Sequence, residues 1–245
     1  MPSPFALIGL AWGFWQKQPA LHTVTAVLLW LPLLLQAALV RALDPWMETQ
    51  SAATTNAILI SFLSLLLVSV VLTWGNACVL IVSKRLLGSA AGRSRTSFKA
   101  VRRQGRGFIL PLILTEILRT CMTILWALLL IIPGIIYTVR TAFASVIVVA
   151  EGIAYRPALK RSIETVRGRT WAVFWRLLAL GLILGVPPSA LAIIADQTIE
   201  LPLLADVAVD LVATGLTAAA ATMFLLSVTA LYGELRILAD REVKF

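Results

Sequence analysis

Charged residues are scarce in this sequence: Asp, Glu, Lys and Arg make up 13% of its 245 residues, against about 25% in an ordinary soluble domain. Cysteine and histidine are scarcer still. Cys78 and Cys121 both lie inside apolar runs, so they form no disulfide framework, and His22 alone adds too few ligands for a structural zinc site. The sequence also lacks a phosphate-binding loop, a zinc motif, a nucleophile elbow and a Ser/His/Asp set. We therefore expect no catalytic site, no metal site, no cofactor and no enzymatic activity.

Apolar residues are abundant instead, at 60% of the chain, and the mean hydropathy is +0.92. A helix needs about 20 mostly apolar residues to cross a hydrocarbon core about 30 Å thick. Six segments are suitable: residues 20–43, 57–82, 108–132, 134–150, 171–195 and 203–231. The sequence predicts an all-α integral membrane protein, in which residues 1–245 form a single membrane domain with six transmembrane helices.

Two pairs of helix-breaking residues mark these spans. Pro133-Gly134 separates the third and fourth spans and predicts a tight helical hairpin, because proline ends a helix and glycine permits a sharp reversal. Pro187-Pro188 lies inside the fifth span. This second pair predicts a kink or a break, unless neighbouring groups satisfy the carbonyls that the prolines leave without a donor.

Basic residues gather in the loops on one side of the predicted spans. Of the 21 Lys and Arg residues, 17 lie before the first span, after the second, after the fourth or after the sixth. The opposite loops hold Arg41 as their single basic residue, beside five acidic residues: Asp44, Glu48, Asp196, Glu200 and Asp206. Because basic residues are retained on the cytoplasmic side, we expect both termini in the cytoplasm.

The densest basic segment, residues 83–107, carries eight Lys and Arg residues and no acidic residue. A net charge of +9 is also typical of nucleic-acid-binding proteins, but here the charge sets the orientation, so we expect no nucleic-acid partner. Basic residues near a membrane surface attract anionic lipid headgroups. We expect such contacts from twelve of them: Lys84, Arg85, Arg93, Arg95, Lys99, Arg102, Arg103, Arg106, Lys160, Arg161, Arg167 and Arg169.

Three shorter segments are amphipathic at helical spacing: residues 4–17, 97–105 and 157–168. In the last of them the apolar residues Leu159, Ile163 and Val166 share one face, and basic residues occupy the other. Such helices lie in the membrane interface. Because each precedes a pair of spans, the chain can be divided into three units, each an interfacial helix followed by a transmembrane hairpin.

Four ionisable residues fall inside the third and fourth spans or at their ends: Glu116, Arg119, Arg140 and Glu151. A charge in mid-membrane costs about 2.5–3.5 kcal/mol on insertion scales, so these residues need partners. The i, i+3 spacing of Glu116 and Arg119 predicts that they pair on one helix face. We expect the four to form an intramembrane polar network. It is either a structural network that fixes helix partners or the lining of a polar cavity for a substrate, ion or lipid headgroup.

A composite motif covers about 40 residues of the second half of the chain. It consists of Pro133-Gly134-Ile135, Arg140, Glu151-Gly152, Ala158-Leu159-Lys160-Arg161-Ser162, Arg167-Gly168-Arg169 and Trp171. On these residues the chain resembles the glycerophosphoryl diester phosphodiesterase membrane-domain family and related bacterial six-span inner-membrane proteins of unknown function. The residues that match recurring positions of that family are Pro133, Gly134, Arg140, Glu151 and Ser162.

The family takes its name from members fused to a catalytic phosphodiesterase barrel. Such a barrel needs about 250 residues, and the six spans leave no room for one in this sequence. The resemblance therefore implies a membrane module in a bacterial inner membrane, associated with the envelope or its lipids and without the hydrolase activity.

Two hypotheses for function remain open. The first is a non-enzymatic inner-membrane protein of envelope or lipid homeostasis that binds lipid, a membrane protein partner or a second copy of itself. The second is a small transporter or channel with a polar path past Glu116, Arg119 and Arg140. Gly181 and Gly185 form a GxxxG pattern that lets helices pack closely, either within the chain or between two copies.

Overall fold

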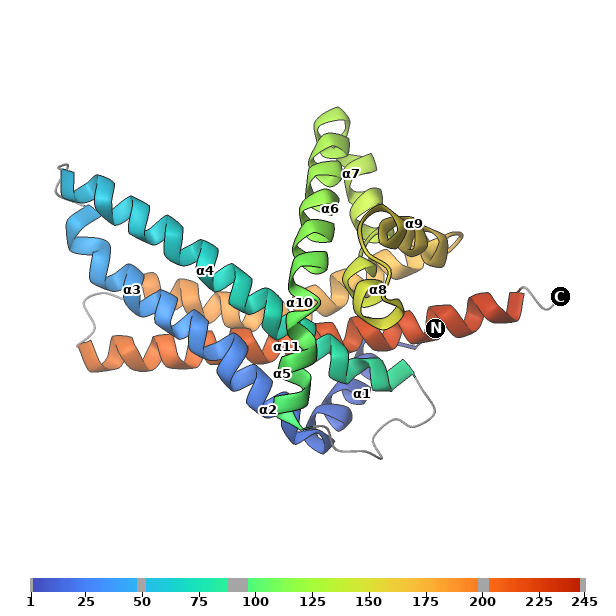
Figure 1. Cartoon of the computed structure of the whole chain (residues 1–245), viewed down its shortest axis with the longest axis horizontal. Coiled ribbons are helices and arrows are strands. Elements are labelled where there is room, and N and C mark those ends of the chain that lie inside the picture. Colours follow the sequence, from blue (N-terminus) through green and yellow to red (C-terminus); the bar gives the residue numbers. More distant parts are fainter. Residues whose placement is uncertain (1, 48–51, 88–96, 198–202, 243–245) are drawn as a thin grey trace.

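The computed structural model describes residues 2–47, 52–87, 97–197 and 203–242, and every regular element in these ranges is a helix (Figure 1). In chain order the elements are α1 (Pro4–Lys17), α2 (Pro19–Val24), the π-helical segment η1 (Thr25–Trp30), α3 (Leu31–Met47), α4 (Ala52–Ser83), the short 3₁₀ helix η2 (Lys84–Leu87), α5 (Phe98–Arg106), α6 (Ile109–Leu129), α7 (Ile131–Arg140), α8 (Ala144–Glu151), α9 (Tyr155–Val166), α10 (Thr170–Gln197) and α11 (Leu203–Glu242).

Six helical segments among the described residues are long and apolar enough to cross a membrane. They are Pro19–Leu43, Thr55–Ser83, Ile109–Leu129, Ile131–Glu151, Thr170–Leu191 and Val207–Leu238. Each overlaps one predicted span, so the prediction of an all-helical chain with six such segments is confirmed. This is the arrangement that lipid requires, because a helix satisfies its own backbone hydrogen bonds.

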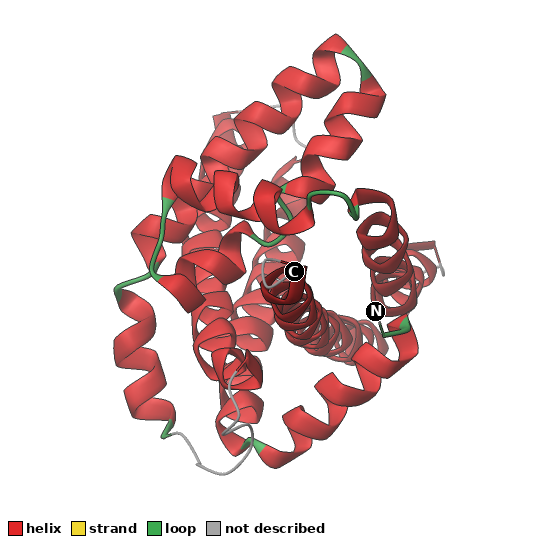
Figure 2. Ribbon diagram, turned by 90° about the vertical axis from the view of Figure 1, so that its right-hand side faces the viewer, coloured by secondary structure: helices red, strands yellow, loops and turns green. Residues whose placement is uncertain are grey.

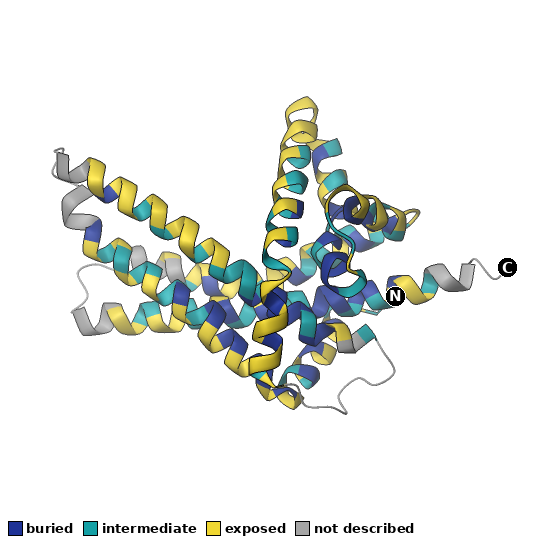
Figure 3. Ribbon diagram, viewed as in Figure 1, coloured by how far each residue is buried: buried dark blue, intermediate teal, exposed yellow. Residues whose placement is uncertain are grey.

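The long helices form three hairpins, α3 with α4, α6 with α7, and α10 with α11, which diverge from a common hub (Figure 1). Their outer parts expose large apolar side chains (Figure 3). Leu128, near the tip of the α6–α7 hairpin, is 83% exposed. Surfaces of this kind suit contact with lipid, since water would not stabilise them.

The core lies at the hub, where α11 is the central helix. Figure 2 shows the C-terminal end of α11 facing the viewer with the other helices around it. Tyr232 of α11 is fully buried and packs against Phe143, with ring centroids 5.8 Å apart. Hydroxyl pairs join α11 to its neighbours: Thr222 contacts Thr25 of η1 at 2.9 Å, and Thr229 contacts Ser83 of α4 at 3.2 Å. Such bonds contribute about 0.6 kcal/mol each in membrane proteins.

The α6–α7 hairpin turns at Leu130, three residues before the predicted Pro133-Gly134 turn. Leu130 has extended backbone angles, φ −161° and ψ 135°, and separates the two helices. Pro133 lies in the first turn of α7, where its missing N–H would have had no helical partner. Gly134 instead permits close packing, because an added Cβ would lie 2.8 Å from the Cα and Cβ of Ala127.

The fifth predicted span carries both the proline pair and the GxxxG pattern. α10 continues as one helix through Pro187 and Pro188, and the hydroxyl of Ser189 donates to the carbonyls of Gly185 and Val186 in the same turn. Around Gly181 and Gly185 an added Cβ would meet no atom within 4 Å, so these glycines do not mediate helix packing within the described part of the chain.

Helices occupy all three segments predicted to be amphipathic, as α1, α5 and α9. Each precedes one of the three hairpins along the chain. Their position at a membrane surface, and the internal threefold repeat, remain predictions from the sequence pattern.

Candidate functional site

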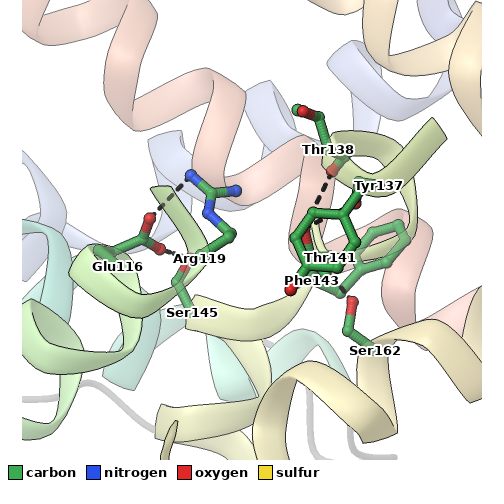
Figure 4. Close-up of polar contacts among 8 residues, drawn as sticks. All are labelled: Glu116, Arg119, Tyr137, Thr138, Thr141, Phe143, Ser145 and Ser162. Carbon is green, nitrogen blue, oxygen red and sulfur yellow. Dashed lines mark hydrogen bonds and ion pairs between the residues drawn. The ribbon is translucent and has the colours of Figure 1, made fainter. Parts of the chain in front are cut away.

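The polar cluster at the middle of α6 is built around Glu116. Its carboxylate lies 2.7 Å from the guanidinium of Arg119, one turn further along the same helix. It also accepts a hydrogen bond of 3.0 Å from the hydroxyl of Ser145 on α8 (Figure 4). The pairing that the i, i+3 spacing predicts is therefore present, and Ser145 adds a link between helices that the sequence pattern did not indicate. Both charged side chains remain about one-third exposed, so the pair is reachable from outside the core.

A second cluster surrounds Glu151 at the end of α8. The hydroxyl of Tyr232 donates to this carboxylate at 2.5 Å, and the guanidinium of Arg161 on α9 lies 3.5 Å from it. The side chain of Glu151 is only 15% exposed. The cluster thus ties three helices together: α8, α9 and α11.

Arg140 belongs to neither cluster. It is exposed at the end of α7, and its Nε donates to the hydroxyl of Thr170 at 3.5 Å. The expectation that Glu116, Arg119, Arg140 and Glu151 form one network is therefore wrong for the described part of the chain. The reason is geometric, because α7 and α8 are two separate helices and their polar residues meet different neighbours.

The fourth predicted span is broken between Arg140 and Ala144. In a continuous helix the N–H of Ala144 would donate to the carbonyl of Arg140, but here it donates to the carbonyl of Thr141. Ser162 of α9 fills the gap: its hydroxyl donates to the carbonyl of Arg140 at 2.7 Å. The same hydroxyl accepts from the N–H of Phe143 at 3.3 Å (Figure 4). One motif residue thereby satisfies two backbone groups that the break leaves without helical partners.

The glycines of the motif shape the turns around α9. Gly152 ends α8 with φ 73°, and Gly168 follows α9 with φ 77°, both in the left-handed region that favours glycine. Between them Tyr155 also has a positive φ of 62°. Its backbone N–H donates to the hydroxyl of the buried Thr115 on α6 at 2.9 Å. Thr115, Ser145 and Tyr232 are the positioning residues that sequence reasoning missed, since each is a common residue type in an ordinary helix.

The basic helix α5 is attached to α4 by a narrow buried stripe. Val101 is 1% exposed, and an added Cβ at Gly105 would lie 2.6 Å from the Sγ of Cys78. The indole N–H of Trp74 donates to the carbonyl of Arg102 at 3.1 Å. Four basic side chains of α5 are exposed: Lys99, Arg102, Arg103 and Arg106, of which Arg106 lies over the ring of Trp74 at 5.3 Å.

The helix α9 has the same design. Its buried residues include Leu159, Ser162 and Val166, and its exposed basic residues include Arg156, Lys160 and Arg161. Lys84 and Arg167 are also exposed, and Arg169 is partly buried. Of the remaining residues expected to contact lipid, Arg93, Arg95 and the side chain of Arg85 lie outside the described residues.

An apolar groove of about 560 Å³ lies between the α6–α7 hairpin and the pair α10 and α11. Its polar lining residues are Arg119, Thr123 and Thr138, and its apolar lining includes Phe174 of α10 and Phe224 of α11. The volume is within the range of small-molecule sites, about 300–1,000 Å³. No pattern in one helix predicts this groove, because four helices contribute to it.

Among the described residues, no group of three or more His, Cys, Asp or Glu side chains is placed to hold a metal ion. Comparison with known proteins adds no relative: no family model matches the chain, and neither a curated protein nor a solved structure does. The functional argument therefore depends on the geometry of these residues.

Proposed function

We propose that this chain is a non-enzymatic multi-pass protein of a bacterial inner membrane that binds anionic lipid, with a role in the envelope or its lipids. The observation that carries the proposal is the shared design of α5 and α9. Each is attached to the hub by a narrow buried stripe and presents basic side chains outward: four on α5, and Arg156 and Lys160 on α9 beside Arg161, which pairs with Glu151.

The charges on these helices suit an anionic surface better than a protein partner of mixed charge. Three exposed basic residues of α5, Lys99, Arg102 and Arg103, occur with no acidic residue in the helix. Each basic residue near an anionic membrane surface contributes about 1 kcal/mol. Three of them together are enough for a measurable preference for anionic over zwitterionic lipid.

The arrangement of the intramembrane charges also favours lipid binding over transport. A polar path past Glu116, Arg119 and Arg140 would need these residues to line one route. Instead Glu116 and Arg119 are paired with each other, and Arg140 contacts Thr170 on a different helix. The groove beside Arg119 has mostly apolar walls, which suit an alkyl chain better than a hydrated ion.

A lipid-binding measurement tests the proposal directly. The delipidated protein in mild detergent is titrated with phosphatidylglycerol or phosphatidylcholine at low and high salt, and the lipids bound are counted by native mass spectrometry. We expect a preference for phosphatidylglycerol that weakens at high salt, because salt screens exposed charges. The triple variant Lys99→Gln, Arg102→Gln, Arg103→Gln is expected to lose most of this salt-sensitive preference.

The matched control keeps the charge, with Arg102→Lys and Arg103→Lys on the same helix. It is expected to retain the preference, because the interaction with a lipid surface depends mainly on charge. A wild type that binds the two lipids equally would contradict the proposal. Salt-dependent flux of a small ion or metabolite through proteoliposomes, without lipid preference, would instead support the transporter.

A further inference from the structure

We infer that the groove between the α6–α7 hairpin and the α10–α11 pair holds one acyl chain of an anionic phospholipid, with its phosphate at Arg119. This inference depends on the proposed function, because it names the site of a tightly held lipid. It concerns a different part of the molecule from the basic helices α5 and α9. The two sites can therefore be tested separately.

The location of the groove indicates lipid as its occupant. All four helices that line it belong to segments that are long and apolar enough to cross a membrane. The groove is open on one side and adjoins exposed apolar residues such as Ile131 at 73% and Ile135 at 46%. A cavity with this surround opens to hydrocarbon, so acyl chains are the molecules available to fill it.

The shape of the groove suits a chain with one polar end. On α6 its lining residues Arg119, Thr123 and Ala127 recur every four residues and form one stripe about 12 Å long at 1.5 Å per residue. Arg119 stands at the hub end of the stripe, and Ala127 lies near the hairpin tip, where it packs against Gly134. An amphiphile therefore meets a cation at one end and apolar walls along the rest.

Arg119 retains the capacity to bind an anion although it is paired. A guanidinium carries five N–H donors, and the contact with Glu116 joins one terminal nitrogen, Nη2, to the carboxylate. Glu116 also accepts from Ser145, which fixes the carboxylate and, through it, the arginine. The arginine is thus held in place at the hub end of the groove, and arginine is well suited to phosphate oxygens.

The test separates this lipid from the salt-sensitive lipids of the basic helices. The protein is loaded with phosphatidylglycerol, washed in detergent at high salt and examined by native mass spectrometry. We expect one phosphatidylglycerol to remain on the wild type. Thr123→Phe, which fills the middle of the groove, is expected to lose it.

Ile124→Phe is the matched control, since Ile124 is the next residue of α6, is 59% exposed and does not line the groove. It is expected to retain the lipid. If Thr123→Phe reduces folded yield, Leu178→Trp takes its place in the test, because Leu178 of α10 lines the same groove. The triple glutamine variant of α5 is expected to keep the salt-resistant lipid. Loss of the salt-sensitive lipid preference therefore tests the proposed function, and loss of the salt-resistant lipid tests the groove.

Four outcomes would overturn the inference. The first is a wild type with no salt-resistant lipid, and the second is groove-filled variants that retain it. The third is retention of oleate but not phosphatidylglycerol, which would assign the groove to free fatty acid. The fourth is a lipid-free dimer that Thr123→Phe dissociates, which would assign the groove to a second copy of the chain.

Discussion

The hydroxyl of Ser162 donates a hydrogen bond of 2.7 Å to the carbonyl of Arg140, 22 residues earlier in the chain. The same hydroxyl accepts from the N–H of Phe143. Ser162 is fully buried, so no water can replace it. A single side chain on α9 therefore holds the break between α7 and α8, and it explains why a serine stands at this position of the motif.

Ser162→Ala is expected to destabilise the protein by about 1–3 kcal/mol, because it leaves two backbone groups without partners in the core. The measurement is thermal or chemical unfolding in detergent. Thr165→Ala is the control on the same helix: its hydroxyl donates to the carbonyl of Arg161 within an exposed turn, and its loss is expected to cost much less. Equal stability of the two variants would contradict the role assigned to Ser162.

The ion pair on α6 predicts coupling between its two members. Glu116→Gln or Arg119→Leu alone leaves a charge without its partner, so each is expected to reduce folded yield and melting temperature. The double variant is expected to recover part of the loss, with a coupling energy of about 0.5–2 kcal/mol. Single variants that melt at the wild-type temperature would contradict the structural role of the pair.

The close approach of Gly134 to Ala127 leaves no room for a side chain at position 134 of the hairpin. In Gly134→Ala the new methyl group would lie 2.8 Å from the backbone of Ala127, so α6 and α7 must separate, at a cost of about 1–3 kcal/mol. Gly181→Ala is the control, since a methyl group there meets no atom within 4 Å. We expect it to be neutral or slightly stabilising in a helix. Melting temperatures in detergent distinguish the two, and an unchanged Gly134→Ala variant would mean that the helices do not pack at this point.

The distribution of basic residues predicts the orientation of the chain. Reporter fusions after Glu48, Ala91, Arg156, Glu200 and Phe245 are expected to be outside, inside, inside, outside and inside the cell. The fusion at Ala91 is the most informative, because the surrounding loop carries eight basic residues and no acidic one. An outside signal there would require all eight to cross the membrane and would overturn the orientation.

The local features of the fold were predictable because they depend on neighbours in the chain. The six apolar segments, the helices at α1, α5 and α9, and the pairing of Glu116 with Arg119 all follow from composition or from helical spacing. The position of the hairpin turn was not predicted correctly. Pro133 can occupy the first turn of a helix as well as end one, and in the hairpin that turns at Leu130 it does the former, with Gly134 close against Ala127.

The partners of the polar residues were not predictable from spacing. Ser145 meets Glu116 across 29 residues, and Tyr232 meets Glu151 across 81. Arg140 was expected to join them, but the break that follows it directs it to Thr170. The sequence identified which residues need partners, and only the packing of the helices selected them.

The sequence by itself determined six helices that are long and apolar enough to span a membrane, together with a strongly basic set of loops. These features can be predicted from the sequence because the length and apolarity of each segment, and the charge of each loop, are properties of a short stretch of chain. The tertiary structure decided how the hairpins meet, where the fourth span breaks, and that four helices enclose a groove beside Arg119. These features depend on side-chain packing and hydrogen bonds between distant helices. In lipid the hydrophobic effect does not select among apolar faces, so their pattern does not specify which ones come together.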